Sequence, residues 1–142
     1  MGWFGAIPLL GLPVLMYNLQ ALLMTPAGVH EPNAQARLGQ ALFTVPMTSG
    51  AAWTVTFSDL LVFVSLVILF IELLKSTTSR QTAIVNHSLS MLLFIVCLVE
   101  FLLLPAFATS GFFLLSAMVL LDVLAGFIVT IASVRRDIDI AR

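Results

Sequence analysis

The stretch from Phe57 to Leu74 reads FSDLLVFVSLVILFIELL, and its only charged residues are Asp59 and Glu72. A helix needs about 20 mostly apolar residues to cross the hydrocarbon core of a bilayer, because each residue adds only about 1.5 Å and every backbone polar group must be paired within the segment. This stretch therefore predicts a membrane-spanning helix.

Three further stretches are long enough to span. Ala83 to Leu104 and Phe112 to Val134 are apolar almost throughout, whereas prolines and amides interrupt Trp3 to Leu23. Prolines are tolerated in a spanning helix when neighbouring helices satisfy the freed carbonyl groups, so Pro8 and Pro13 predict a kinked first helix packed against the other three. A re-entrant or interfacial first segment stays open as an alternative.

The composition excludes an ordinary soluble protein. Of the 142 residues, 61% are hydrophobic and 9% are charged, whereas soluble domains carry about 25% charged residues. Lipid or partner protein must therefore take the place of a polar shell. The net charge of −1 gives no basic surface for nucleic acid. We predict one all-α domain, residues 1–142, that forms an integral membrane four-helix bundle in a lipid bilayer.

The basic residues predict the orientation of the bundle. Lysine and arginine are enriched in short cytoplasmic loops, and here they gather between the second and third predicted spans and in the tail: Lys75, Arg80, Arg135, Arg136 and Arg142. Both termini are therefore expected on the cytoplasmic side, and the loop from residue 25 to 56 outside. We expect a multi-pass protein of the cell membrane, which in a bacterium is the inner membrane.

The outer loop contains a second periodic pattern. Small and apolar residues recur at helical spacing between Asn33 and Phe43, opposite Gln35 and Gln40, at Ala34, Leu38, Ala41 and Leu42. This pattern predicts a short amphipathic helix on the membrane surface. A solvated loop with accidental periodicity is the alternative.

Carboxylates inside the predicted spans are the first candidates for a functional site, because a charged group in hydrocarbon is costly. They are Asp59, Glu72, Glu100 and Asp122. Asp122 lies near the predicted midplane, level with Ser65 and with no basic residue at its depth, so we expect it to be protonated. Glu100, nearer the outer face and level with Asp59, would be the entry partner of a proton or cation site. Alternatively, a neutral Asp122 only donates a hydrogen bond to another helix.

The second and third spans form an antiparallel hairpin, which predicts a further pairing. The turn centres between Ser79 and Arg80, so residues whose numbers add to about 159 share a depth. Glu72 then lies level with His87, and we expect their side chains about 3 to 5 Å apart. Lys75, three residues after Glu72, is a competing partner.

Polar residues also mark the faces on which these two helices meet. Asn86 and Ser90 lie on one stripe of the third span, and Ser65 and Glu72 lie on one stripe of the second. Polar and small stripes associate in lipid, where purely apolar contacts gain nothing over lipid tails. We expect the two stripes to pack against each other.

No motif for enzymatic, metal or cofactor chemistry is present. The chain lacks a GxSxG elbow, a glycine-rich phosphate loop and His/Cys metal spacing. A haem held by two histidines would need a second histidine in the membrane, and His30 lies in the predicted outer loop. We therefore expect no enzyme, no metal and no cofactor.

Two functions remain. The first is a non-catalytic accessory or assembly subunit that packs against partner membrane proteins or itself, as a homo-oligomer or in a larger membrane complex. The alternative is a small oligomeric proton- or cation-coupled transporter or channel that uses the intramembrane carboxylates. A transporter needs those carboxylates in a water-accessible cavity, whereas a packing subunit buries them in hydrogen bonds.

In size and topology, the chain is similar to small multidrug transporters and to the small membrane subunits of tripartite carriers. The first of these families is expected to carry its key carboxylate in the first span, and Trp3 to Leu23 contains none.

Overall fold

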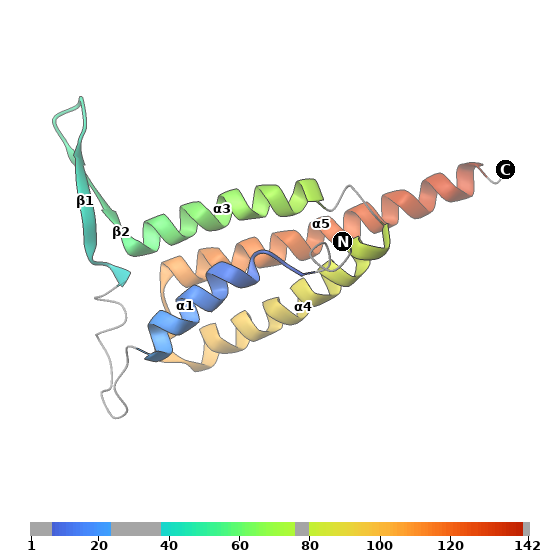
Figure 1. The fold of residues 1–142 in the computed structure, drawn as a ribbon, viewed down its shortest axis with the longest axis horizontal. Helices are drawn as coiled ribbons and strands as arrows, with labels where there is room; N and C mark the ends of the chain where they lie inside the picture. Colours follow the sequence, from blue (N-terminus) through green and yellow to red (C-terminus); the bar gives the residue numbers. More distant parts are fainter. Residues whose placement is uncertain (1–6, 24–37, 76–79, 141–142) are drawn as a thin grey trace.

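The computed structural model describes residues 7–23, 38–75 and 80–140 (Figure 1). This part of the chain is mostly helical and includes one small antiparallel sheet. In chain order the elements are α1 (Gly11–Leu23), β1 (Ala41–Pro46), β2 (Ala52–Thr56), α3 (Phe57–Lys75), α4 (Arg80–Leu103), the short 3-10 helix η1 (Pro105–Phe107) and α5 (Ser110–Ile140).

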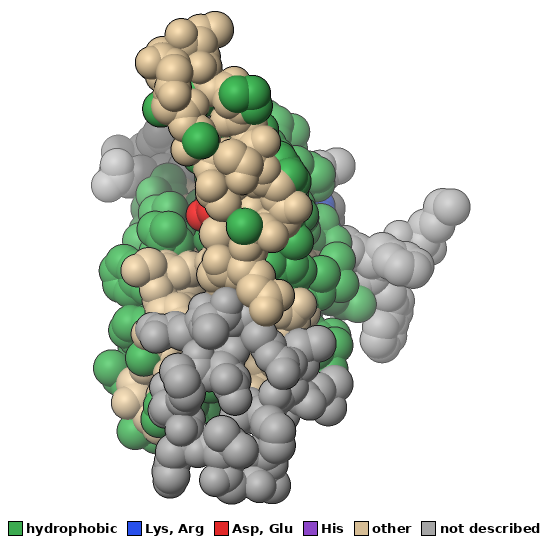
Figure 2. Space-filling view, turned by 90° about the vertical axis from the view of Figure 1, so that its left-hand side faces the viewer, with side chains coloured by type: hydrophobic (Ala, Val, Ile, Leu, Met, Phe, Trp, Pro, Cys, Tyr) green, Lys and Arg blue, Asp and Glu red, His purple; other side chains and the backbone are tan. Residues whose placement is uncertain are grey.

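Among the described residues, three helices are long and apolar enough to cross a membrane, over Phe57–Lys75, Ile84–Leu103 and Ser110–Val129. Their outward side chains are large hydrophobic groups, such as Phe63 and Leu102, and Figure 2 shows hydrophobic side chains on both flanks of the hairpin end. Such a surface suits lipid tails and not water. Three of the four predicted segments are thereby confirmed as long apolar helices, and as candidate spans they indicate a small multi-pass membrane protein in contact with a bilayer.

Helix α5 lies between α3 and α4 (Figure 1) and forms the centre of the bundle. Within its span 44% of the residues are buried, against 22% in each of the other two. Two glycines let its neighbours approach closely. A Cβ atom added at Gly111 would lie 2.1 Å from Ser58 Oγ of α3, and one at Gly126 would lie 2.0 Å from His87 Cγ of α4. Small residues at such crossings are typical of helix packing in membranes.

Helix α1 is shorter than the predicted first span. It has 13 residues, so it is about 20 Å long, less than the hydrocarbon thickness of about 30 Å. The chain turns at Pro8, whose carbonyl accepts from Gly11 N at 3.1 Å. Pro13 is the third residue of the helix, where its missing N–H has no helical partner in any case. Within the described residues the first predicted segment is thus a helix over Gly11–Leu23; residues 1–6 lie outside the described part, so the span over Trp3–Leu23 stays a prediction.

Tyr17 anchors α1 to the turn between α4 and α5. Its hydroxyl lies 2.5 Å from Thr109 Oγ1, and its ring centre lies 4.7 Å from that of Phe112 and 5.6 Å from that of Phe107. All three rings are fully buried. The aromatic contacts therefore fix α1 against the bundle at the end near η1.

The predicted all-α class is wrong in one place. Residues Phe43 to Val45 pair with Trp53 to Val55 in an antiparallel hairpin, and Gly50 takes a φ of +84° in its turn. β-branched and aromatic side chains favour strands, and glycine supplies the left-handed turn conformation. The amphipathic helix predicted over Asn33–Phe43 therefore does not form at Ala41–Phe43, which belong to β1; residues 33–37 lie outside the described part.

The bundle has two chemically different ends. Helices α1 and α4 run toward the hairpin, whereas α3 and α5 start there (Figure 1). Ile7, Lys75 and Arg80 therefore share the opposite end, which we call the basic end, and α5 extends beyond it to Ile140. Lys75 and Arg80 therefore lie at the opposite end of the described bundle from the hairpin of β1 and β2 (Figure 1).

We predict that the hairpin faces the outside of the membrane. In a Cys97→Ser background, a cysteine at Ser49 in the exposed hairpin turn should react with an impermeant thiol reagent on intact cells, because the basic end is held in the cytoplasm. A cysteine at Ile140 serves as the control and should react only after permeabilisation. The reverse labelling pattern would overturn the orientation.

Candidate functional site

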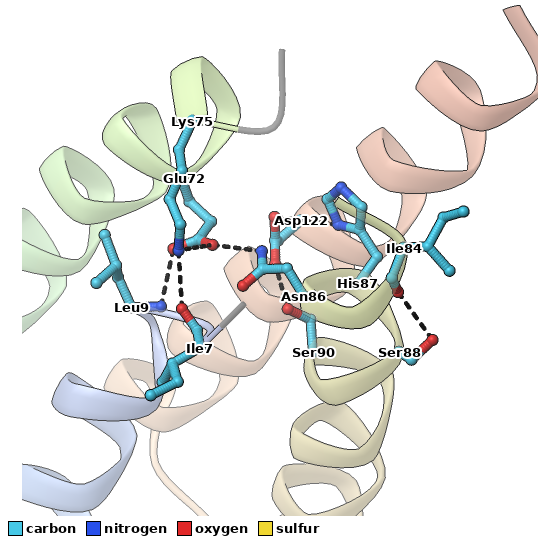
Figure 3. A network of polar contacts seen from close by, with 10 residues as sticks. All are labelled: Ile7, Leu9, Glu72, Lys75, Ile84, Asn86, His87, Ser88, Ser90 and Asp122. Carbon is cyan, nitrogen blue, oxygen red and sulfur yellow. Dashed lines mark hydrogen bonds and ion pairs between the residues drawn. The ribbon is translucent and has the colours of Figure 1, made fainter. Parts of the chain in front are cut away.

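Polar side chains gather between the basic ends of α3 and α4 and the middle of α5 (Figure 3). They are Glu72, Lys75, Asn86, His87, Ser90 and Asp122, and we call them the polar cluster. Glu72, Ser90 and Asp122 are fully buried. Buried polar groups in a membrane protein need partners from the protein itself, so the hydrogen bonds of this cluster show what each member does.

Glu72 caps the start of α1. Its Oε2 atom accepts a hydrogen bond of 2.8 Å from Leu9 N, in the turn that precedes Gly11. Backbone N–H groups at the start of a helix have no helical acceptor, and the helix dipole favours a negative charge there. Glu72 therefore supplies from α3 the acceptor that the non-helical residues before α1 lack.

The second oxygen of Glu72 joins α3, α4 and the N-terminal segment. Lys75 Nζ donates to Glu72 Oε1 at 3.2 Å and to the carbonyl oxygen of Ile7 at 2.8 Å, and Asn86 Nδ2 donates to the same Oε1 atom. The carboxylate thus accepts from three donors on three segments. The arrangement is a structural tie between helices.

The structure does not bring Glu72 and His87 together as the sequence predicts. The depth match is correct to within one residue, because Asn86 contacts Glu72. One residue along a helix is a rotation of about 100°, and this rotation turns His87 toward α5. The predicted competing contact between Lys75 and Glu72 is present.

His87 instead lies beside Asp122. His87 Nδ1 is 3.8 Å from Asp122 Oδ1, and Ser90 Oγ donates to Asp122 Oδ2 at 2.5 Å. The expectation of no basic residue at the depth of Asp122 is therefore wrong. The sequence argument aligned α3 with α4 only, whereas Ser90–Asp122 and His87–Gly126 set the register of α4 against α5.

Several buried atoms of the cluster have no hydrogen-bond partner. They are Asn86 Oδ1, both ring nitrogens of His87 and Asp122 Oδ1. The His87 side chain is 10% exposed and that of Asp122 is fully buried. Such atoms are uncommon in proteins because burying them without a partner is costly. Three of these four atoms belong to His87 and Asp122. These two side chains can therefore form further hydrogen bonds.

Two other predicted site residues lie outside the cluster and have local partners. Ser65 Oγ donates to the carbonyl oxygen of Leu61 in its own helix at 2.7 Å. Asp59 Oδ2 accepts from Thr56 N at 2.9 Å and from Thr56 Oγ1 at 2.7 Å, and Asp59 N donates back to Thr56 Oγ1. This exchange is a capping box at the start of α3. The polar side chains of Ser65 and Asp59 thus both find their hydrogen-bond partners within α3 or at its N-terminal cap.

Glu100 lies in a groove between α1 and α4, near the hairpin end. Its Oε2 atom accepts from Asn18 Nδ2 at 3.2 Å. The groove has a volume of about 570 Å³ and is otherwise apolar, with walls formed by Gly11, Val14, Leu15, Leu19, Leu93 and Val96. The sequence analysis did not assign Asn18 to a site; an amide in an apolar segment was the signal that could have revealed it.

The chemistry available to these residues is hydrogen bonding and proton exchange. In residues 7–23, 38–75 and 80–140, no group of three or more His, Cys, Asp or Glu side chains is arranged to hold a metal ion. Comparison with known proteins adds no constraint, since no family model, no curated protein and no solved structure matches the chain. Function must therefore be inferred from the geometry.

We predict that Glu72 is the main polar determinant of stability. Glu72→Ala should lower the free energy of unfolding by about 3 kcal/mol, because it leaves three donors without their acceptor, one of them charged. Glu72→Gln keeps one acceptor oxygen and should cost about half as much. Titration with denaturing detergent, followed by circular dichroism, measures both changes.

Asp59→Asn is the matched control, because it alters an exposed carboxylate of the same helix and should change the unfolding free energy by less than about 0.5 kcal/mol. Equal stability of Glu72→Ala and the parent protein would show that the tie between α1, α3 and α4 is unimportant.

Proposed function

We propose that this protein is a non-catalytic membrane subunit that assembles with other membrane proteins, or with copies of itself, through its lipid-facing helix surfaces. The observation that supports this function is the use made of the intramembrane carboxylates. Glu72 ties three segments together, Asp122 joins α5 to Ser90 of α4, and Glu100 joins α4 to Asn18 of α1. In a bundle built for packing, carboxylates serve as hydrogen-bond acceptors between helices.

The α1–α4 groove is the proposed assembly surface. Glu100 is only partly buried there, and Asn18 donates to one of its oxygens. A half-buried carboxylate near hydrocarbon gains from a second donor, and a transmembrane helix of a partner can supply one. Gly11 lines the groove and has no side chain, so that such a helix can approach closely at this point.

Proton- or cation-coupled transport is the second candidate, and the unpartnered atoms around Asp122 favour it. The α1–α4 groove supports the transport function less than it supports assembly. Glu100 lies in the groove wall, whereas Asp122 is fully buried and is not part of that wall. A transport path would have to connect the two carboxylates, so we prefer the assembly function.

The assembly function predicts that Glu100→Leu separates the complex without unfolding the chain. The protein, purified in a mild detergent, should have a mass well above that of the 15.4 kDa chain. Loss of an interhelical hydrogen bond of about 1.4 kcal/mol should lower the association constant about tenfold. Native mass spectrometry measures the assembled fraction, and circular dichroism checks the helix content.

Val99→Leu is the matched control, because Val99 is exposed on α4 and does not line the groove; it should assemble as the parent protein does. A parent protein that is monomeric and accompanied by no other chain would contradict the assembly function.

A flux experiment distinguishes the second candidate. Asp122→Asn keeps the shape of the side chain but cannot exchange a proton. If the parent protein carries a pH-gradient-driven flux in vesicles, and Asp122→Asn loses that flux while it still assembles, transport replaces assembly as the function.

A further inference from the structure

The contact between α4 and α5 holds two titratable groups that face each other without a hydrogen bond. His87 Nδ1 and Asp122 Oδ1 lie 3.8 Å apart, and neither atom has a hydrogen-bond partner. In a neutral imidazole one ring nitrogen donates and the other accepts, and in a protonated imidazole both donate, whereas a carboxylate oxygen only accepts. When the hydrogen of a neutral His87 is on Nε2, Nδ1 and Oδ1 are two acceptors that face each other. A single proton between the two atoms would therefore satisfy both.

The position of the imidazole is set by packing. The ring lies directly against Gly126 of α5, where an added Cβ atom would come within 2.0 Å of Cγ, 2.3 Å of Cδ2 and 2.4 Å of Nδ1. Figure 3 shows His87 beside Asp122, on the side of α4 that faces α5. Because Gly126 has no side chain, the His87 ring packs against its backbone, and this packing keeps Nδ1 near the carboxylate of Asp122.

Two charged groups of the cluster, Glu72 and Lys75, act on Asp122 with opposite sign. On α3, Glu72 and Lys75 face the cluster but are paired with each other at 3.2 Å. On α4, Ser90 contributes a neutral hydroxyl. The described residues of α1 contain no Asp, Glu, Lys, Arg or His. On α5 the next charged position is Arg135, about 20 Å further along the helix axis.

We propose that His87 and Asp122 form a proton-binding site, which exchanges with the basic end of the bundle through His87. Without the proton, the site holds a buried carboxylate and a neutral imidazole that carries its hydrogen on Nε2. With it, the Nδ1–H group donates to Oδ1, or the proton resides on Asp122 and is donated to Nδ1. Both ring nitrogens of His87 are buried, but His87 is only seven residues, about 10 Å, from Arg80 at the basic end of α4, so this end offers the shorter route for the proton.

Binding of the proton strengthens the contact between α4 and α5, because it adds a hydrogen bond at a point where the helices already touch. The site therefore links the packing of the bundle to the pH on one side of the membrane. This inference goes beyond the assembly function and does not depend on it, since the site is contained within one chain.

Nitrogen NMR and infrared spectroscopy across pH test the proposal on the whole protein in lipid nanodiscs. In a His30→Gln background, the ring nitrogens of His87 give the state of the imidazole, and the carboxyl band removed by Asp122→Asn gives the state of Asp122. We expect both signals to change at the same pH. In Asp122→Asn, the midpoint of the His87 change should move by at least about one pH unit.

Two variants and a control complete the test. His87→Gln should shift the pH midpoint of the Asp122 carboxyl band by a similar amount. Gly126→Ala, which displaces the imidazole ring, should make the pH midpoints of the His87 and Asp122 signals differ. Asp59→Asn, whose carboxylate lies in the capping box of α3, should alter neither signal. Circular dichroism confirms that each variant is folded.

The proposal is overturned if the His87 midpoint is the same in the parent protein and in Asp122→Asn, or if the Asp122 band is unaffected by His87→Gln. A Gly126→Ala protein that does not fold leaves both of those comparisons intact. Neither outcome bears on the mass of the complex that tests the assembly function.

Discussion

A bilayer offers no water to backbone groups, and this constraint governs how α1 joins the rest of the protein. Residues 7–10, which precede Gly11, are not helical, so their N–H groups need acceptors from elsewhere. Glu72 supplies one to Leu9, and Lys75 in turn donates to the carbonyl of Ile7. Tyr17, at the middle of the same helix, contacts Thr109 and two aromatic rings. This short helix is thus secured by polar contacts at its start and aromatic contacts at its middle.

The centre of the bundle depends on small residues in the same way. Gly111 and Gly126 lie on α5, one contacting α3 and the other α4. At each point a neighbouring polar side chain, Ser58 or His87, reaches the backbone of the central helix. Lipid tails compete well with apolar contacts between helices, so close approach and occasional hydrogen bonds carry the specificity of packing. The buried polar groups of α4 are therefore part of the reason that α5 is central.

The three long spans could be predicted from sequence because length and hydrophobicity alone determine whether a helix fits a bilayer. The same reasoning gave the depth of Glu72 to within one residue of its partner Asn86. It failed for the partner of His87. That partner depends on the rotation of α4 about its axis and on the register of α4 against α5, and both direct His87 to Asp122. It also failed in the outer loop, where a helical spacing of apolar residues competed with strand-forming residues at Phe43 to Val45 and a glycine turn. Asp59 sits three residues after Thr56, so its capping role was visible in the spacing.

The junction between the hairpin and α3 has a structural consequence. Strand β2 ends at Thr56, α3 begins at Phe57, and the hydrogen bonds between Thr56 and Asp59 stiffen the step between them. The hairpin and α3 are therefore joined without an intervening loop, and the cap fixes the first turn of the helix to the last residue of the strand. Glu72 lies about 22 Å along the same helix, so a single continuous helix connects the hairpin to the carboxylate that holds α1.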